Sequence, residues 1–170
     1  TEGSVHDVNL LDVMPIEPGS YYVMDKGYID FYRLYNHFHQ ARAYFVMRAK
    51  DNLRCEVISS SEVDKDTGLI SDQIVKLTGY KSSKSYPDEF RLVIYEDYAK
   101  NTVYPFMTND FDLPALSIAE LYRERWKIEL FFKWIKQHLH IKAFYGTSQN
   151  AVACQIWIAT CTYLLIAIAK

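Results

Sequence analysis

Two short apolar runs flank a longer stretch of mixed apolar and polar residues in the first third of the chain. Apolar runs at residues 21–24 and 44–47 predict buried strands, and the mixed stretch from about Tyr28 to Ala41 predicts a helix between them. Strand, helix and strand in succession are typical of an α/β sheet. Asp25 then follows the first strand directly. By position alone, Asp25 either caps the next helix or presents a carboxylate at a strand end.

Residues 51–112 change in character. They carry twelve acidic against seven basic residues, with polar turns and β-rich runs. Strands are predicted at 54–63, 69–78, 90–96 and 102–108. This segment predicts an antiparallel β insertion. Six of its aromatic residues are interpreted as core or cross-strand packing residues and not as base-stacking platforms: Tyr80, Tyr86, Phe90, Tyr95, Tyr98 and Tyr104.

Helices are predicted at both ends of the chain. A cap at Ser4 would start a short helix that runs to Met14. After Pro114, a capping box of Ser117 and Glu120 predicts a long helix over 118–139, whose many large apolar residues indicate burial.

A last helix is predicted after a cap at Ser148. Residues 151–169 are uncharged, so this segment is long enough for a membrane span. Its alanines and its polar residues, such as Gln155 and Thr160, favour a helix buried in a soluble core.

A polar stripe runs along the long helix. Tyr122, Arg125, Glu129 and Lys136 stand at positions i, i+3, i+7 and i+14, which places them within an arc of roughly 60° on one face. One interpretation is a solvated face with an Arg125–Glu129 ion pair. The other is a functional stripe, because a narrow polar face on a buried helix needs partners.

Composition and charge set broad limits. The chain has 170 residues, of which 49% are hydrophobic and few are Gly or Pro. This composition predicts one globular domain with an inserted subdomain. The net charge of −2 is not that of a typical nucleic-acid-binding protein. However, residues 121–142 hold six basic and two acidic residues, a net charge of +4, so the rest of the chain has a net charge of −6. The opening Thr1-Glu2-Gly3, without Met or a signal peptide, indicates a piece of a longer protein.

Cysteine and histidine give no metal-site pattern. The three cysteines lack paired spacing, and Cys154 and Cys161 are expected to be buried reduced thiols in a cytosolic protein. The pairs His37 with His39 and His138 with His140 are two residues apart, so each pair points to different helix faces. These histidines are interpreted as surface or packing residues.

The spacing Tyr-x2-Arg-x3-Glu-x6-Lys, with Arg-Trp-x-Ile-Glu inside it, resembles the signature of bacterial insertion-sequence transposases of the DDE type. The segment from Tyr22 to Tyr28 resembles the one that carries this family's second catalytic carboxylate. The resemblance implies an α/β, ribonuclease H-like fold. Residues 1–50 and 113–170 would belong to its core, and residues 51–112 to its β insertion.

The resemblance also implies a chemistry. Asp25 and Glu129 would be catalytic carboxylates that bind Mg²⁺, or Mn²⁺ in its place, in a two-metal site. Tyr122, Arg125 and Lys136 would bind DNA phosphates. The expected function is cleavage and strand transfer of double-stranded DNA by a cytoplasmic bacterial enzyme that acts as a homodimer.

One expected feature of the family is missing. Its first catalytic Asp lies on a strand upstream of anything that resembles Thr1, so the chain is expected to be incomplete, inactive alone and left with an exposed sheet edge. Two alternatives stay open. A ribonuclease H-like nuclease or resolvase would share Asp25 and Glu129, and a catalytically inactive transposase-derived DNA-binding protein would keep the basic helix.

Overall fold

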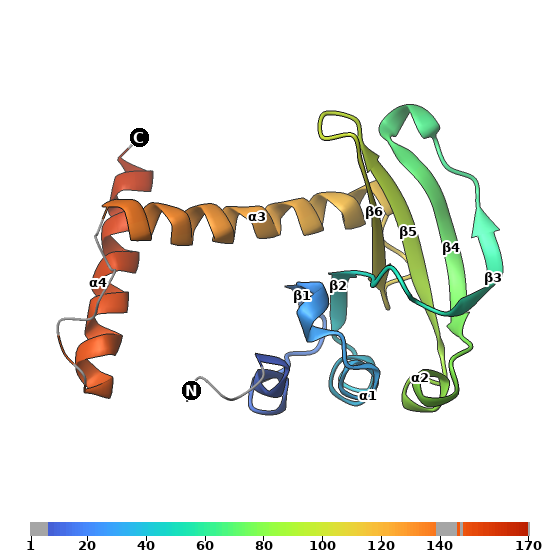
Figure 1. Cartoon of the computed structure of the whole chain (residues 1–170), viewed down its shortest axis with the longest axis horizontal. Coiled ribbons are helices and arrows are strands. Elements are labelled where there is room, and N and C mark those ends of the chain that lie inside the picture. The colour runs from blue at the N-terminus through green and yellow to red at the C-terminus, as the bar shows by residue number, and fades with distance from the viewer. Residues whose placement is uncertain (1–6, 139–145, 147, 170) are drawn as a thin grey trace. The chain divides into compact units, whose positions relative to one another are not determined.

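The computed structural model describes residues 7–138, 146 and 148–169. They fall into two units, residues 1–123 and 124–170, with the boundary inside one long helix. Figure 1 labels the helices and strands of both units.

A mixed six-stranded sheet forms the centre of the first unit. Its strands stand in the order β1-β2-β6-β5-β4-β3, so β1 and β3 are its edges among the described residues. Strand β1 pairs in parallel with β2, and every other pair is antiparallel. The bounds are β1 Tyr21–Met24, β2 Tyr44–Arg48, β3 Cys55–Ser61, β4 Leu69–Leu77, β5 Glu89–Asp97 and β6 Thr102–Thr108. All six predicted strands are thus present, within one or two residues at each end.

The predicted β insertion contributes four strands to this same sheet. Strands β3 to β6 form an antiparallel meander, and β6 joins it to β2 through the pair Val46 and Thr108. Among its aromatic residues, Tyr86 and Phe90 are buried, and Tyr95 lies opposite Tyr104 across β5 and β6. The expected core and cross-strand roles are therefore confirmed at these four positions. Tyr80 and Tyr98 are exposed.

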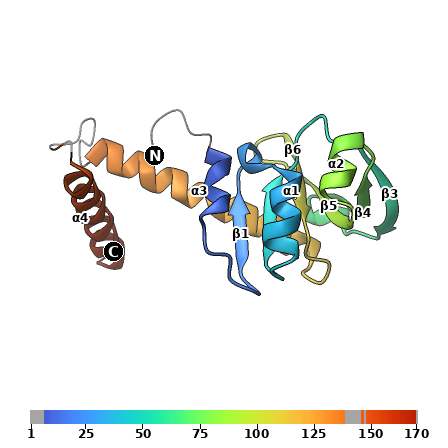
Figure 2. The same cartoon turned by 90° about the horizontal axis from the view of Figure 1, so that it is seen from below.

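Side chains alternate between the two faces of the sheet, and helices cover each face. On one face Phe45 and Met47 pack with Leu34 and Phe38 from the segment after β1, and with Tyr86 at the end of α2 (Tyr80–Ser85). Figures 1 and 2 show α1 and α2 beside the strands that they cover. On the other face another set packs against the start of α3: Val46, Val93 and Phe106 with Ile118, Ala119 and Tyr122. The alternation along β2 explains both layers, because successive strand residues point to opposite faces.

The helix predicted from Tyr28 begins later than expected. A 3-10 turn at Lys26–Tyr28 comes first, and α1 (Phe31–Arg33) then continues as a π-helix over Leu34–His39. The reason is the cap: the side chain of Asp30 accepts a hydrogen bond from the backbone N–H of Arg33 at 3.1 Å. Asp25 makes no such capping bond. The capping interpretation of Asp25 is therefore wrong, and its carboxylate is left for another role.

The long helix α3 runs from Ala115 to His138. Ser117 lies inside its first turn and so does not cap it, which corrects the predicted start. The backbone N–H of Ile118 instead donates to the carbonyl of Pro114 at 3.3 Å. The expected burial of this helix holds for its first half, as far as Tyr122, and beyond that for Ile135. Most large apolar residues beyond that point are exposed, including Ile128, Leu130 and Phe132.

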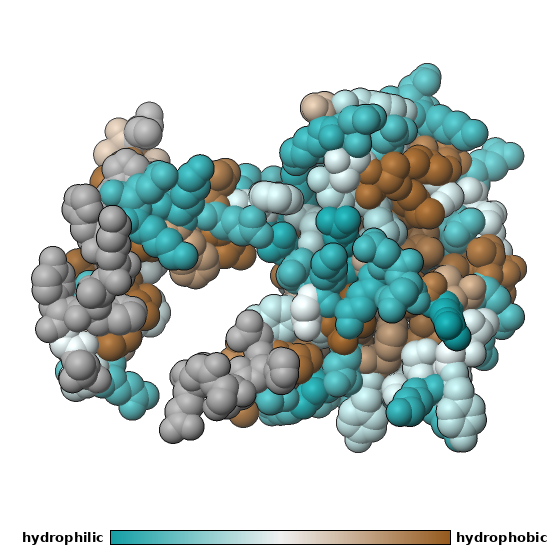
Figure 3. All heavy atoms as spheres, viewed as in Figure 1, coloured by the Kyte–Doolittle hydropathy of each residue, from teal (hydrophilic) through white to brown (hydrophobic). Residues whose placement is uncertain are grey.

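The last helix, α4 (Gln149–Ile168), starts at the predicted cap, because the Ser148 side chain accepts from the N–H of Ala151 at 3.2 Å. Within the second unit, Tyr163 packs against Phe131 and Trp134 of α3. Burial in a soluble core was expected, but most of α4 is exposed, and Figure 3 shows apolar patches on both helices. Cys154 and Cys161 are consequently exposed rather than buried.

By length and composition α4 could also cross a membrane, a test that the core helix of a soluble protein passes as well.

The predicted N-terminal helix is present as a short 3-10 helix. It occupies Asp7–Asp12, while Ser4 lies outside the described residues. His37 and His39 have separate partners: a ring nitrogen of His37 lies 2.9 Å from the carbonyl of Leu11, and His39 lies 3.2 Å from Asp88. This agrees with their interpretation as surface or packing residues. The side chains of His138 and His140 lie outside the described residues.

Candidate active site

Asp25 lies at the end of β1, as predicted, and its carboxylate is exposed. The turn that follows is held by the backbone, since the N–H of Tyr28 donates to the carbonyl of Asp25 at 3.0 Å. A strand end is a favourable place for a functional carboxylate in an α/β sheet, because ligands bind outside the carboxyl ends of parallel strands. Asp25 occupies that position beside the only parallel strand pair among the described residues.

Tyr122 lies against Asp25 although 97 residues separate them in sequence. Its ring is buried and packs on Phe106 with the ring centroids 4.8 Å apart. Its hydroxyl reaches to 3.4 Å from the Asp25 carboxylate. The first residue of the helical signature and the carboxylate after β1, which the sequence singled out separately, therefore meet in one place.

A buried polar network fixes the chain just before α3. The Arg91 guanidinium donates to both carboxylate oxygens of Asp72 at 2.7 Å, and also to the carbonyl of Leu113. Arg91 and Asp72 are both buried on the face that α3 covers. Because a buried charge needs a paired and hydrogen-bonded partner, this arrangement ties β4 and β5 to the loop that leads into α3.

Asp110 links the same loop to the first residue of β1. Its carboxylate accepts hydrogen bonds from the Tyr21 hydroxyl and from the backbone N–H groups of Asp112 and Leu113, at 2.8 and 3.0 Å for the last two. Burial acts to raise the pKa of Asp110, but these three hydrogen bonds and the charge of Arg91 outweigh it, and the pKa is lowered. Burial, together with the hydrogen bond to this carboxylate, raises the pKa of Tyr21 above its ordinary value.

The network has a consequence for the site. Strand β1 begins at Tyr21 and ends just before Asp25, while α3 begins shortly after Asp110 and carries Tyr122 two turns later. The Tyr21–Asp110 hydrogen bond thus joins the two elements at one end, and Asp25 and Tyr122 meet at the other. Sequence reasoning missed this network. The available signal was the pair of opposite charges, Asp72 and Arg91, near the middle of two predicted neighbouring strands.

Glu129 forms, within the second unit, the ion pair with Arg125 that the solvated-face interpretation of the stripe expected. The Arg125 guanidinium lies 2.7 Å from its carboxylate, one helical turn away, and stacks on Trp126 at 5.8 Å from the ring centroid. The Arg125 side chain is largely covered and that of Glu129 is about half exposed. A carboxylate held by a neighbouring guanidinium keeps a fixed direction while one edge still faces solvent.

Lys136 shares a surface hollow with Glu129. The hollow measures about 550 Å³ and is also lined by Phe132, Lys133 and Gln137. Two lysine ammonium groups beside one carboxylate give this hollow a positive balance. It can therefore accept a phosphate and present a carboxylate to the same ligand.

The donor chemistry of Asp25 and Glu129 suits a hard divalent cation, since Mg²⁺ prefers carboxylate oxygen ligands. Within residues 7–138, 146 and 148–169, however, no three His, Cys, Asp or Glu side chains come together in a way that could hold a metal. The structure brings Asp25 to Tyr122 and Glu129 to Arg125 and Lys136, and these two groups belong to different units. The described residues thus supply two suitable carboxylates and not a complete site.

Comparison with known protein families gives a match along almost the whole chain. Residues 1–165 match the family model described as the transposase DDE domain. No solved structure matches the chain at a significant level.

Three relatives agree with the family model. A putative transposase, y4zB, from Sinorhizobium fredii is 36% identical over 173 residues, which cover 99% of this chain and 48% of the relative. A probable transposase for insertion sequence element IS5377 from Geobacillus stearothermophilus is 32% identical over a match that covers 85% of this chain and 38% of the relative. A putative transposase for insertion sequence element IS4SA from Synechocystis is 30% identical over a match that covers 85% of this chain and 39% of the relative. The chain therefore spans less than half the length of each of these relatives.

Proposed function

The chain belongs to the transposase DDE domain family, and we propose that it forms the distal part of the catalytic domain of an insertion-sequence transposase that cleaves and transfers double-stranded DNA. The contact between Tyr122 and Asp25 supports this proposal best. The α/β fold by itself does not require that Tyr122, the first residue of the helical signature, lie beside the Asp25 carboxylate.

The proposed fold is a ribonuclease H-like core with an insertion. Residues 1–50 and 113–170 would form the core, and residues 51–112 the insertion, whose four strands continue the core sheet through the pairing of β6 with β2. Strand β1 is an edge of the sheet among the described residues. Further strands of a complete core would pair at this edge, next to Asp25.

Asp25 and Glu129 would hold the metal ions, Mg²⁺ or Mn²⁺ in its place, in a two-metal site. Such ions, when bound, generate the attacking hydroxide and neutralise the charge that develops on the phosphate. The chain itself positions the carboxylates. The Tyr122 hydroxyl lies beside Asp25, and the guanidinium of Arg125 orients Glu129.

The cationic residues of the signature would hold the DNA backbone. Lys136 lies in the same hollow as Glu129, so its ammonium group can bind a phosphate oxygen next to that carboxylate. Arg125 and Tyr122 would add further donors to the phosphates. These contacts place the backbone without reading the base sequence.

The third carboxylate of the site is proposed to come from outside this chain. The partial coverage of the relatives supports this proposal, since the chain covers 48% of the relative y4zB. The chain alone would then be inactive, and the complete enzyme would act in the bacterial cytoplasm as a homodimer that pairs two DNA ends. On this account the apolar surface of α4 packs against protein and not against lipid.

A pair of substitutions in the full-length transposase tests the proposal. Glu129→Gln removes the metal-binding charge with little change in shape, and Glu124→Gln is its matched control on the same helix, where Glu124 pairs with Lys127 on the exposed surface. The first variant should lose Mg²⁺-dependent cleavage and strand transfer by more than about 100-fold, beyond the 10–100-fold loss typical of an outer-shell partner, and should still bind DNA. Equal activity in both variants would refute the assignment.

A further inference from the structure

A second hollow lies in the first unit, at the carboxyl ends of β1 and β2. It measures about 430 Å³, and the turns after the two strands line it: Lys26, Gly27, Lys50, Asp51 and Asn52. The strands are parallel neighbours, with Met24 beside Met47, so both turns leave the sheet at the same edge. Ligands of α/β sheets bind outside this edge, and Asp25 stands there too. The hollow is called the Lys26–Lys50 hollow below.

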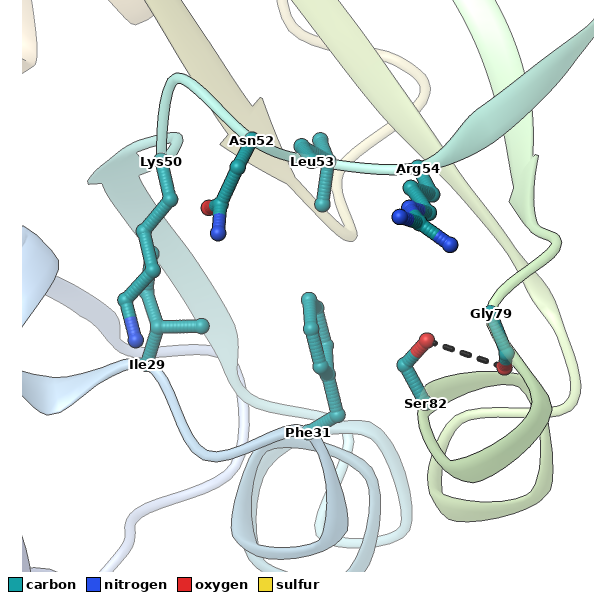
Figure 4. Close-up of a pocket in the computed structure, with 8 residues that line it drawn as sticks. All are labelled: Ile29, Phe31, Lys50, Asn52, Leu53, Arg54, Gly79 and Ser82. Atoms are coloured by element: carbon teal, nitrogen blue, oxygen red, sulfur yellow. Dashed lines mark hydrogen bonds between the residues drawn. The ribbon is translucent and has the colours of Figure 1, made fainter.

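Backbone hydrogen bonds hold both turns in place. After β1, the N–H of Ile29 donates to the carbonyl of Lys26 at 3.3 Å. After β2, the N–H of Leu53 donates to the carbonyl of Lys50 at 3.0 Å. Figure 4 shows the Lys50 side chain extending toward Ile29, and thus toward the turn that carries Lys26. The two lysines therefore serve one hollow from two fixed turns.

The side chains that line the Lys26–Lys50 hollow have a net positive charge. Lys26 and Lys50 contribute two ammonium groups and Asp51 one carboxylate, while the Asn52 amide can both donate and accept. Both lysines are exposed, and neither forms an ion pair with a residue that the structure describes. A backbone phosphate of DNA carries one negative charge and accepts hydrogen bonds from lysine and amide groups. The hollow therefore matches one such phosphate in charge and in donors.

We propose that Lys26 and Lys50 together hold one backbone phosphate of the DNA strand that is cleaved, next to the phosphate at Asp25. The proposal rests on the function proposed above. Lys26 follows Asp25 directly, and consecutive Cα atoms are about 3.8 Å apart, so a phosphate on Lys26 lies close to this carboxylate. Lys50 reaches the same phosphate from the turn after β2.

The two lysines also set the path of the strand. A strand with one phosphate at Asp25 and a neighbouring phosphate in the Lys26–Lys50 hollow crosses the carboxyl ends of β1 and β2. Lys26 and Lys50 are thus positioning residues. They fix the strand relative to the sheet and leave the reaction at the phosphorus atom to other groups.

Uncharged phosphate analogues test the proposal from the side of the DNA. Full-length transposase is titrated with fluorescein-labelled duplexes of the DNA end that it cleaves, each with one phosphate replaced by a methylphosphonate. Fluorescence anisotropy should show an affinity loss of about fivefold at one position beside the cleavage site, the size of an exposed charge contact. In Lys26→Gln with Lys50→Gln this position should no longer matter, whereas losses at other positions should stay. A loss at every position that persists in the double variant would overturn the proposal.

The salt dependence of binding shows whether the two lysines share one phosphate. Duplex binding loses about 0.9 in the log–log salt slope for each phosphate contact removed, so the double variant should reduce the slope by about 0.9. A reduction of about 1.8 would mean two separate phosphates and would overturn the shared contact.

Two further double variants serve as controls. Lys26→Arg with Lys50→Arg keeps both charges, so the methylphosphonate loss should remain. Lys65→Gln with Lys100→Gln removes two exposed lysines from the turn between β3 and β4 and the turn between β5 and β6. This variant should leave the slope and the methylphosphonate pattern unchanged. An equal change in it would show a general effect of charge and would refute a phosphate contact in the Lys26–Lys50 hollow.

The outcomes separate this proposal from the function on which it rests, because both readouts measure binding and not cleavage. Loss of cleavage in Glu129→Gln, together with native binding by the double glutamine variant, would keep the catalytic assignment and reject the phosphate contact. Full cleavage in Glu129→Gln would reject that assignment, and the methylphosphonate comparison would still decide the contact. Both lysines are exposed, so the glutamine variants should fold like the native protein, which thermal unfolding checks.

Discussion

The two halves of helix α3 contain the same kinds of residues, but they are held in different ways. In the first half, Ile118 is 0% and Tyr122 4% exposed, because both lie against Val46, Val93 and Phe106 on one face of the sheet. In the second half, Ile128 is 55% and Leu130 61% exposed. The difference shows that burial depends on the surface that a helix meets and not only on its own apolar residues. Among the signature residues, Tyr122 is fixed by tertiary packing, whereas Glu129 is held mainly by an ion pair along the helix.

The largest expected effect concerns the network that anchors the first half. Replacing Arg91 by Met leaves the buried carboxylate of Asp72 without its partner, which should lower the free energy of unfolding by about 3–5 kcal/mol. Urea denaturation followed by circular dichroism measures this loss. The double variant with Asp72→Leu should recover most of it, since an apolar pair can replace a buried ion pair. A loss below about 1 kcal/mol in the single variant would mean that Arg91 does not anchor the loop before α3.

A matched pair of isoleucines tests the comparison directly. Ile118→Ala removes buried apolar atoms and leaves a cavity, so it should cost about 2–5 kcal/mol of unfolding free energy. Ile128→Ala makes the same chemical change on the exposed half and should stay within about 0.5 kcal/mol. Denaturant unfolding of both variants gives the two values. Similar losses at both positions would contradict the difference between the halves.

The hydrogen bond between Tyr21 and Asp110 makes a smaller and pH-dependent contribution. Tyr21→Phe should cost about 1.5–3 kcal/mol near neutral pH, the range for a hydrogen bond to a charged group. The folded state lowers the pKa of Asp110 below its ordinary value of 3.8. Its stabilising effect is therefore complete above that value and is lost as the pH falls through the lowered pKa.

The free energy of unfolding, measured at pH values from 7 down to 2, tests this pH dependence. In Tyr21→Phe the acid-side loss should be shallower than in the native chain, because one of the interactions that lower the pKa is gone. An unchanged acid profile would show that Tyr21 does not act on Asp110.

The smallest effect on stability is expected at Glu129. Its ion pair with Arg125 joins neighbouring turns of one helix and is half exposed, so Glu129→Gln should change the free energy of unfolding by only about 0.3–0.5 kcal/mol. Thermal unfolding in low and high salt measures this change and its screening. A large destabilisation would assign Glu129 a structural role in place of a functional one.

Sequence patterns predicted the strands well, because each strand alternates or runs apolar between clear turns. They also placed Asp25 at a strand end and four signature residues on one helix face. The start of the helix after β1 was misjudged, because Asp25, Tyr28 and Asp30 are all plausible near a helix start and only the structure shows that Asp30 caps it. Burial of α4 was misjudged for a different reason. The hydropathy of α4 predicts that the helix packs against another apolar surface, but it does not identify that surface.

The candidate site was predictable only where chemistry leaves a local pattern. The spacing of Tyr122, Arg125, Glu129 and Lys136 is such a pattern, and the Arg125–Glu129 pair follows from it. The contact between Tyr122 and Asp25 depends on how β1 and α3 meet, and this is set by Arg91, Asp72 and Asp110 far away in sequence. Such long-range polar contacts have no period, so no local analysis finds them.

The central claim is that Asp25 and Glu129 are two carboxylates of one metal site that this chain does not complete by itself. The most direct test is calorimetric titration of Mg²⁺ and Mn²⁺ into this chain, into the full-length transposase, and into full-length variants with Asp25→Ala or Glu129→Ala. The account predicts binding by the full-length protein only, and loss of that binding in both variants. Tight binding by the short chain, or full-length binding that survives both substitutions, would contradict it.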